Sequence, residues 1–308
     1  MGYISYVYKK KFVCRYDQEV GVPYHVYTDF PGLKQEAYTF INSSKVEIHY
    51  FYYYYDNYRD DKIVLFIHGL GPGHASYLAE INALAKKGYK ILTFDATGCG
   101  ESKGKILKSL NQPTRDVIEL LEFLKLDKPI VLVGHSLGGY TSLNVLNLRK
   151  DITKAVVMSG FLSIASELGT SIKSSFICKH ILKYEKKVEP ELYKLDNVEF
   201  LKNTKDQIFF IQSDDDQMVP YDIALKVVEG IDNPNIKKLR VTGKKHNPNY
   251  SYAAVDYMNE VFGRFNELIN KKEIRTDEQR IAYFKDVSLE RLVEQDEDII
   301  NQICEFIG

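Results

Sequence analysis

Short apolar segments alternate with stretches of helical periodicity along most of this chain, and this alternation limits the possible folds more than any other feature. Apolar runs of four or five residues are typical of strands that are buried on both faces of a sheet. Where helices separate such runs, they predict βαβ crossovers and a largely parallel sheet. The six segments are residues 63–67 (IVLFI), 90–94 (KILTF), 129–133 (PIVLV), 154–158 (KAVVM), 207–211 (QIFFI) and 238–241 (KLRV).

Two segments nearer the amino terminus have no helix between them. Residues 37–41 (AYTFI) and 46–55 (VEIHYFYYYY) alternate or run as strands, so we expect an antiparallel edge hairpin with its turn at residues 42–45. The tyrosines of the second segment are expected to fill the strand. Apolar stripes at helical spacing predict helices at residues 77–84 and 117–124.

The composition excludes several classes of protein. Lys and Arg number 41 and Asp and Glu 42, a net charge of -1, whereas nucleic-acid-binding proteins are markedly basic, so we expect no nucleic-acid partner. The longest apolar runs are far shorter than the roughly 18 residues of a transmembrane helix, and the amino terminus lacks the apolar core of a signal peptide. The cysteines are scattered without CxxC spacing, which argues against disulfides and zinc. These features predict a cytoplasmic protein with reduced thiols.

The most informative motif is GHSLG at residues 134–138, directly after a predicted buried strand and before a helical pattern. A strand, a tight turn and a helix form the context that GxSxG requires, because the glycines allow the backbone to approach closely around a strained serine. Ser136 would then stand exposed at the carboxyl edge of the sheet, above the amino terminus of the following helix. This context predicts a nucleophilic serine.

From about residue 37 to 270, the sequence resembles the α/β-hydrolase fold family. Residues 68–71 (HGLG) are similar to the oxyanion-loop motif of that family, and residues 95–102 (DATGCGES) are similar to its DxxGxGxS turn. Residues 213–220 (SDDDQMVP) resemble its Gly-x-x-Asp-x-x-Val-Pro loop, although Ser213 replaces the usual glycine. The resemblance implies a mostly parallel central sheet, helices on both of its faces and a small helical cap insertion.

The same resemblance implies a catalytic triad of Ser136, Asp216 and His246. The chemistry agrees, because a serine hydroxyl needs an imidazole as base and the imidazole needs a carboxylate to orient it. His246 alone among the histidines sits in a loop just past the last predicted strand. For the acid, the register against Val219 and Pro220 favours Asp216, with Asp215 as the alternative.

The oxyanion hole is expected to be built from the backbone amides of Leu70 and Leu137. His68 is expected to stabilise a buried turn, and His135 to point away from the nucleophile. We expect no nucleophilic role for Cys99, because no motif positions a base beside it. Before His246, Lys244 and Lys245 predict a solvated loop that could draw anionic substrates. Asp95 is expected to stabilise a turn.

The resemblance divides the chain into an N-terminal extension (1–36), an α/β-hydrolase core (37–161 and 207–308) and a cap insertion (162–206). The insertion is longer than ordinary connections and leaves the sheet at the edge that presents Ser136, so we expect it to cover the site. Residues 247–308 hold two helical patterns, of which one must cover the sheet while the other is an addition. The stripes fall at Ala254, Tyr257, Met258, Val261, Phe265 and Leu268, and at Leu289, Leu292, Val293, Ile300, Ile303 and Ile307.

Together with the expected triad, the resemblance implies a serine hydrolase that cleaves small-molecule carboxylic esters with small to medium acyl chains through an acyl-enzyme. Because the triad itself activates the nucleophile, we expect no metal or organic cofactor. Thioesterase, lipase and aminopeptidase activities are alternatives on the same triad. An aminopeptidase would need a carboxylate in the cap to hold the substrate amine, for which Glu167, Glu185 and Glu189 are candidates. A ligand-binding protein without turnover is the alternative from another class. The sequence predicts no oligomeric state.

Overall fold

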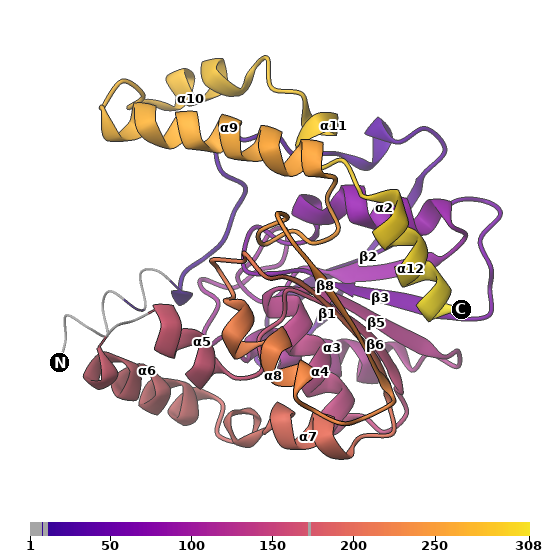
Figure 1. Ribbon diagram of the computed structural model, residues 1–308. Coiled ribbons are helices and arrows are strands. Elements are labelled where there is room, and N and C mark those ends of the chain that lie inside the picture. The colour runs from indigo at the N-terminus through magenta and orange to yellow at the C-terminus, as the bar shows by residue number, and fades with distance from the viewer. Residues whose placement is uncertain (1–7, 9–11, 172–173) are drawn as a thin grey trace.

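The structure is a computed structural model that describes residues 8, 12–171 and 174–308. An eight-stranded sheet lies at its centre in the order β1-β2-β4-β3-β5-β6-β7-β8 (Figure 1). β1 and β2 form the predicted antiparallel hairpin at one edge, β2 pairs antiparallel with β4, and the remaining pairs are parallel. The strands are β1 Lys34–Ile41, β2 Glu47–Tyr54, β3 Ile63–Ile67, β4 Lys90–Phe94, β5 Ile130–His135, β6 Lys154–Met158, β7 Gln207–Ser213 and β8 Ile236–Val241.

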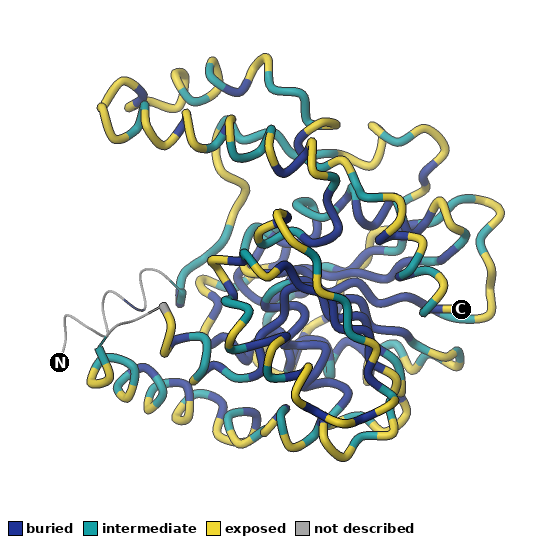
Figure 2. Tube along the Cα trace, viewed as in Figure 1, coloured by how far each residue is buried: buried dark blue, intermediate teal, exposed yellow. Residues whose placement is uncertain are grey.

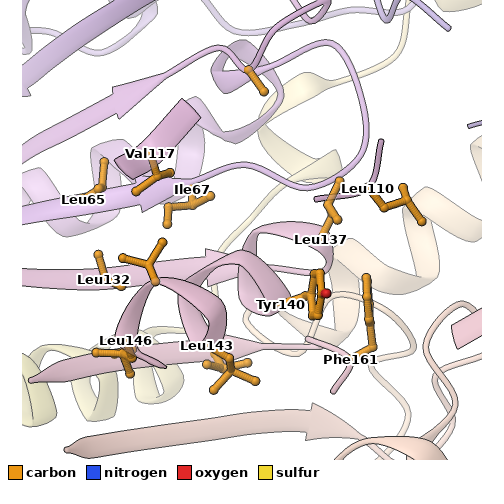
Figure 3. Packing of buried hydrophobic residues seen from close by; sticks show 14 of the residues in the cluster. Leu65, Ile67, Leu110, Val117, Leu132, Leu137, Tyr140, Leu143, Leu146 and Phe161 are labelled. Atoms are coloured by element: carbon orange, nitrogen blue, oxygen red, sulfur yellow. The ribbon is translucent and has the colours of Figure 1, made fainter. Parts of the chain in front are cut away.

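Helices cover both faces of the sheet, as predicted. The strand β3 shows why: Leu65 and Ile67 pack into the cluster on one face, and Val64 and Phe66 pack into the cluster on the other. Figure 2 shows the strands as the buried centre of the fold, and Figure 3 shows Leu65, Leu132 and Tyr140 packing in the first cluster. The helices of the first face include α3 Gln112–Leu124, α4 Leu137–Leu148, α7 Asn197–Asn203 and α8 Leu225–Glu229.

The other face is covered by α2 (Leu78–Lys86) and α12 (Glu297–Ile307). Four isoleucines of α12 are buried there, so α12 is the carboxyl-terminal helix that covers the sheet. The prediction of one continuous final helix was wrong. A short helix, α11 (Leu289–Leu292), is separated from α12 because Asp296 caps α12 by accepting hydrogen bonds from the Asp298 and Ile299 amides.

A helical arm, residues 252–292, precedes α12. It consists of α9 (Tyr252–Asn270), α10 (Asp277–Phe284) and α11, and Figure 1 shows α9 and α10 side by side, extending beyond the sheet. Phe265 of α9 and Phe284 of α10 share a small cluster separate from the two main ones. The arm is therefore the addition that the sequence predicted, with a core of its own.

Residues 162–206 connect β6 to β7 and are largely helical in the described part. The elements are α5 Ile164–Ser171, α6 Ser175–Val188, η3 Leu192–Lys194 and α7. Leu168 and Ile181 are buried against the first core cluster, which anchors the segment to the body of the protein. Across the described ranges, no helix combines the length and the apolar character needed to span a membrane. Most of the amino-terminal stretch on which the signal-peptide prediction rests lies outside the described residues.

Candidate active site

The turn between β5 and α4 holds Ser136 in a strained conformation. Its φ is 56° and its ψ is -119°, values that non-glycine residues rarely adopt. The flanking glycines are sterically required: a Cβ at Gly134 would lie 2.2 Å from the Gly138 carbonyl oxygen, and one at Gly138 would lie 2.0 Å from the Ile67 carbonyl oxygen. Only glycine fits at these two positions, so the motif allows the tight strand-to-helix turn that it predicted.

His246 and Asp216 are in direct contact. Nδ1 of His246 lies 2.9 Å from Oδ2 and 3.1 Å from Oδ1 of Asp216. The carboxylate is fully buried and is held by the amides of Met218 and Val219, which donate to Oδ1 at 2.9 and 3.0 Å. A carboxylate fixed in this way can orient the imidazole and hold the proton on its Nδ1.

The two neighbouring acids have different partners. Asp214 accepts a hydrogen bond from the Thr242 hydroxyl at 2.8 Å. Asp215 accepts hydrogen bonds from the Gly243 and Lys245 amides and from the hydroxyl of Ser213, and although burial opposes it, these bonds lower the pKa of Asp215. Ser213, the departure from the usual glycine, therefore helps to tie the two loops together.

Ser136 and His246 line the same pocket, which has a volume of about 520 Å³. Leu70 also lines it, while Leu137, the other predicted oxyanion residue, is the first residue of α4 and is buried. Further walls come from the predicted motifs and the residues beside them: His135, Gln217, Met218, Lys245 and Asn247. Tyr77, Met258 and Asn259 come from parts of the chain that the motifs did not indicate. In the described part of the chain, no residue of 162–206 lines this pocket, which differs from the expectation that this segment covers Ser136.

The loop after β3 is held rigid by side chains. His68 is buried, accepts a hydrogen bond from the Ala96 amide on Nε2 at 3.1 Å, and so carries its proton on Nδ1, which donates to the Gly69 carbonyl at 2.7 Å. Burial lowers the pKa of His68, which keeps the ring neutral. The Gly69 amide donates to the Tyr77 hydroxyl at 3.1 Å. The turn-stabilising role predicted for His68 agrees with these contacts.

His135 links that loop to the loop of His246. Burial lowers the pKa of His135 to about 3, so its ring is neutral. Its Nε2 lies 2.7 Å from the His246 carbonyl oxygen and must donate to it, which leaves Nδ1 to accept from the Tyr77 hydroxyl at 3.0 Å. A chain of hydrogen bonds therefore runs from the Gly69 amide through Tyr77 and His135 to the backbone of His246. The sequence carries no signal for it.

The two lysines before His246 have different environments. Lys245 is exposed and lines the pocket. Lys244, which we expected in a solvated loop, is 1% exposed, forms an ion pair with Asp296, and donates to the Tyr250 carbonyl at 2.7 Å. Lys244 is therefore unavailable to substrates and instead fastens the loop of His246 to the start of α12.

The other reactive groups near the site are structural. Cys99 is buried, and burial raises the pKa of its thiol well above the usual value, so the thiolate is disfavoured. Asp95 is also buried; burial opposes its ionisation, but the charge and hydrogen bonds of His74 lower its pKa. It accepts hydrogen bonds from the His74 and Glu101 amides, as a turn-stabilising residue would.

The cap carboxylates Glu185 and Glu189 are engaged by neighbouring side chains. Glu185 is buried and accepts hydrogen bonds from the hydroxyls of Tyr8 and Ser109. Glu189 is paired with Arg115 of α3. Both contacts anchor α6 to the core. Among the described residues, no group of three or more His, Cys, Asp or Glu side chains is arranged to hold a metal ion.

The family model that matches this chain is described as serine aminopeptidase, S33 (Hydrolase_4), and it covers residues 59–235, more than half of the sequence. The matched region contains the Ser136 turn and the Asp216 loop.

Curated relatives match over shorter stretches. An epoxide hydrolase of Caballeronia sordidicola is 38% identical over 30% of this chain and 29% of its own length. The sn-1-specific diacylglycerol lipase ABHD11 of Mus musculus is 30% identical over 35% of this chain and 36% of its own length. The chain thus spans about a third of the length of these relatives.

Among solved structures, an esterase of Pyrococcus furiosus superposes with a TM-score of 0.59. It is 20% identical, and the superposition covers 83% of this chain and 98% of that one. At this identity the similarity concerns the fold: the α/β-hydrolase architecture of a central sheet with helices on both faces, as predicted.

Proposed function

Because the chain belongs to the serine aminopeptidase S33 family of α/β-hydrolases, we propose that it is a serine hydrolase that cleaves carboxylic esters through an acyl-enzyme. The observation that carries the proposal is that His246, hydrogen-bonded to the buried Asp216 at 2.9 Å, lines one pocket with a serine in a strained strand-to-helix turn. Such an arrangement supplies nucleophile, base and orienting acid in the α/β-hydrolase chain order.

In the proposed mechanism, Ser136 Oγ attacks the ester carbonyl while Nε2 of His246 takes its proton. Asp216 holds the proton on Nδ1, so that Nε2 is free to accept, and stabilises the imidazolium that forms. His246 then gives the proton to the leaving alcohol, and a water molecule repeats the sequence to release the acid. The proton and acyl transfers in this proposal use these three side chains and one water molecule.

The tetrahedral intermediate needs donors for its oxyanion. The amide of Leu137 follows the nucleophile at the amino terminus of α4, where the helix dipole favours negative charge. The Gly69 amide already donates to Tyr77, so the next amide of that loop, that of Leu70, is the second donor in this proposal. Tyr77 and His135 act as positioning residues, since they connect this loop to the backbone of His246.

Tyr77→Phe tests the positioning role. It removes the acceptor for the Gly69 amide and the donor to His135, so the oxyanion loop should loosen and kcat for p-nitrophenyl butyrate should fall roughly tenfold, with a smaller change in KM. Tyr55→Phe is the matched control, because its hydroxyl donates to Asn82 of α2 and does not line the pocket. An equal effect of both substitutions, or an effect on KM alone, would contradict the role.

Esters are favoured over peptides with a free amino terminus because the candidate amine-binding carboxylates Glu185 and Glu189 are engaged in anchoring α6. A sequence relative is a diacylglycerol lipase, and an esterase shares the fold. The division into an N-terminal extension (1–36), a core (37–161 and 207–308) and a cap (162–206) remains part of the proposal.

The discriminating experiment compares turnover of p-nitrophenyl butyrate with that of leucine p-nitroanilide by the purified protein. Ester turnover at least a hundredfold above the hydroxide background, with little amide turnover, is the expected result. Preferential amide cleavage would replace the esterase proposal with an aminopeptidase on the same residues. No turnover of either class, together with failure to cleave thioesters, would favour a binding protein.

A further inference from the structure

A second pocket, of about 250 Å³, lies beneath the helical arm. Its walls come from the amino-terminal segment, from residues 75–79 at the start of α2, from α9, and from α11 with the residue that follows it. The apolar side chains that define it are Val22, Pro23, Leu78, Met258, Phe262 and Leu292. None of the motifs that indicate catalysis lies in it.

Met258 connects this pocket to the catalytic one, because its side chain lines both. It extends from α9, and its sulfur lies 3.8 Å from Nδ2 of Asn247, the residue after His246. On the opposite side, Ala75 and Ser76 of the second pocket directly precede Tyr77 of the catalytic pocket. The two cavities are therefore neighbours that share the flexible, unbranched side chain of Met258.

The second pocket has the chemistry of a site for an uncharged chain. Its charged lining residue in the described chain is Glu19, which is exposed at the rim, and the ring of His25 is paired with Asp29. Binding becomes stronger when apolar groups of a ligand leave water and fill an apolar cavity. The affinity rises about fourfold for each methylene that is fully buried. A carboxylate or phosphate would lie against Glu19 and apolar walls without a cationic partner among the residues that line the pocket.

We propose that this second pocket binds the aliphatic chain of the ester that Ser136 cleaves, with Met258 marking the boundary between the reacting ester group and the chain. The inference rests on the proposed function and deepens it: the substrates are esters with an unbranched aliphatic chain long enough to pass Met258. Selectivity for that chain then resides in the helical arm and not in residues 162–206.

Two substitutions test the pocket from different sides. Met258→Trp narrows the passage between the cavities, and Ala79→Phe fills the second pocket from α2. The matched control is Glu260→Trp, which places the same indole on the exposed face of α9 and lines neither pocket. Each variant is assayed on p-nitrophenyl acetate, butyrate, octanoate and decanoate, and on butyl, octyl and decyl acetates.

Both pocket variants should lower kcat/KM for the decanoate relative to the butyrate by about tenfold or more, mainly through KM, if the chain belongs to the acyl group. If the chain belongs to the alcohol, the same loss should appear in the alkyl acetate series. The Glu260→Trp control should keep the wild-type profile in both series. A loss of kcat/KM for the long substrates in either series supports binding of the chain in the second pocket. The series that shows the loss identifies whether the acyl or the alcohol part of the ester binds there.

Unchanged profiles in both series for Met258→Trp and Ala79→Phe would overturn the inference. That outcome differs from failure of the proposed function, in which the wild-type protein itself would not hydrolyse the acetate or the butyrate. Far-UV circular dichroism of each variant verifies that it is folded, and two independent substitutions prevent one misfolded protein from deciding the result.

Discussion

Ser136→Ala is expected to reduce kcat for p-nitrophenyl butyrate by about 10⁴-fold or more, because it removes the only group that forms the acyl-enzyme in the proposed mechanism. The substitution should leave the fold intact, since the hydroxyl is replaced by hydrogen while the flanking Gly134 and Gly138 still permit the turn. Initial rates and far-UV circular dichroism of the purified variant measure both effects.

The matched control for this substitution is Ser159→Ala. Ser159 follows β6, is buried, and like Ser136 has a positive φ, of 47°, but it does not line the catalytic pocket. Its replacement should leave kcat within about threefold of the wild type. If Ser136→Ala keeps more than about a tenth of the wild-type rate, the serine is not the nucleophile.

Asp216→Asn should lower kcat by about 10³- to 10⁴-fold, with KM little changed. Asn presents an N–H group to Nδ1 of His246, so the ring can no longer keep its proton there and Nε2 loses its role as base. The effect is large because His246 acts as a base only while Asp216 holds the proton on its Nδ1. The measurement is kcat at pH 8 for the variant and the wild type.

Asp215→Asn and Asp214→Asn separate this role from loop stability. The side-chain oxygen of Asn at position 215 can still accept hydrogen bonds from the Gly243 and Lys245 amides. The described side-chain hydrogen bond of Asp214 is the one from Thr242. Both variants should therefore lose less than about tenfold in kcat. A crippled Asp215→Asn alongside an active Asp216→Asn would move the acid one residue upstream.

The sequence could predict the sheet and the Ser136 turn because both depend on local patterns. Each buried strand appears as a short apolar run, and Gly134 and Gly138 are required by contacts within the turn and with β3. Asp216 could be preferred over Asp215 from its register against Val219, and the direct contact with His246 agrees with that preference.

The remaining features depend on contacts between distant segments, which periodicity does not reveal. We expected Lys244 to be solvated because its ion-pair partner, Asp296, lies 52 residues away at the amino terminus of α12. Asp296 also begins α12 within residues 289–307, which we expected to form one helix. The sequence pattern likewise identified Met258 as an apolar position of an amphipathic helix. Its place in the pocket of Ser136 depends on how the helical arm packs against the rest of the protein.

The most direct test of the triad is site-resolved labelling with a fluorophosphonate, which reacts with a serine only when a neighbouring base activates it. The folded protein should gain one adduct, mapped by peptide mass spectrometry to Ser136, and the rate of labelling should fall sharply in Asp216→Asn and in His246→Ala. Denatured protein should gain none. An adduct on another serine, or no adduct on a folded protein that still hydrolyses esters, would contradict a Ser136–His246–Asp216 triad.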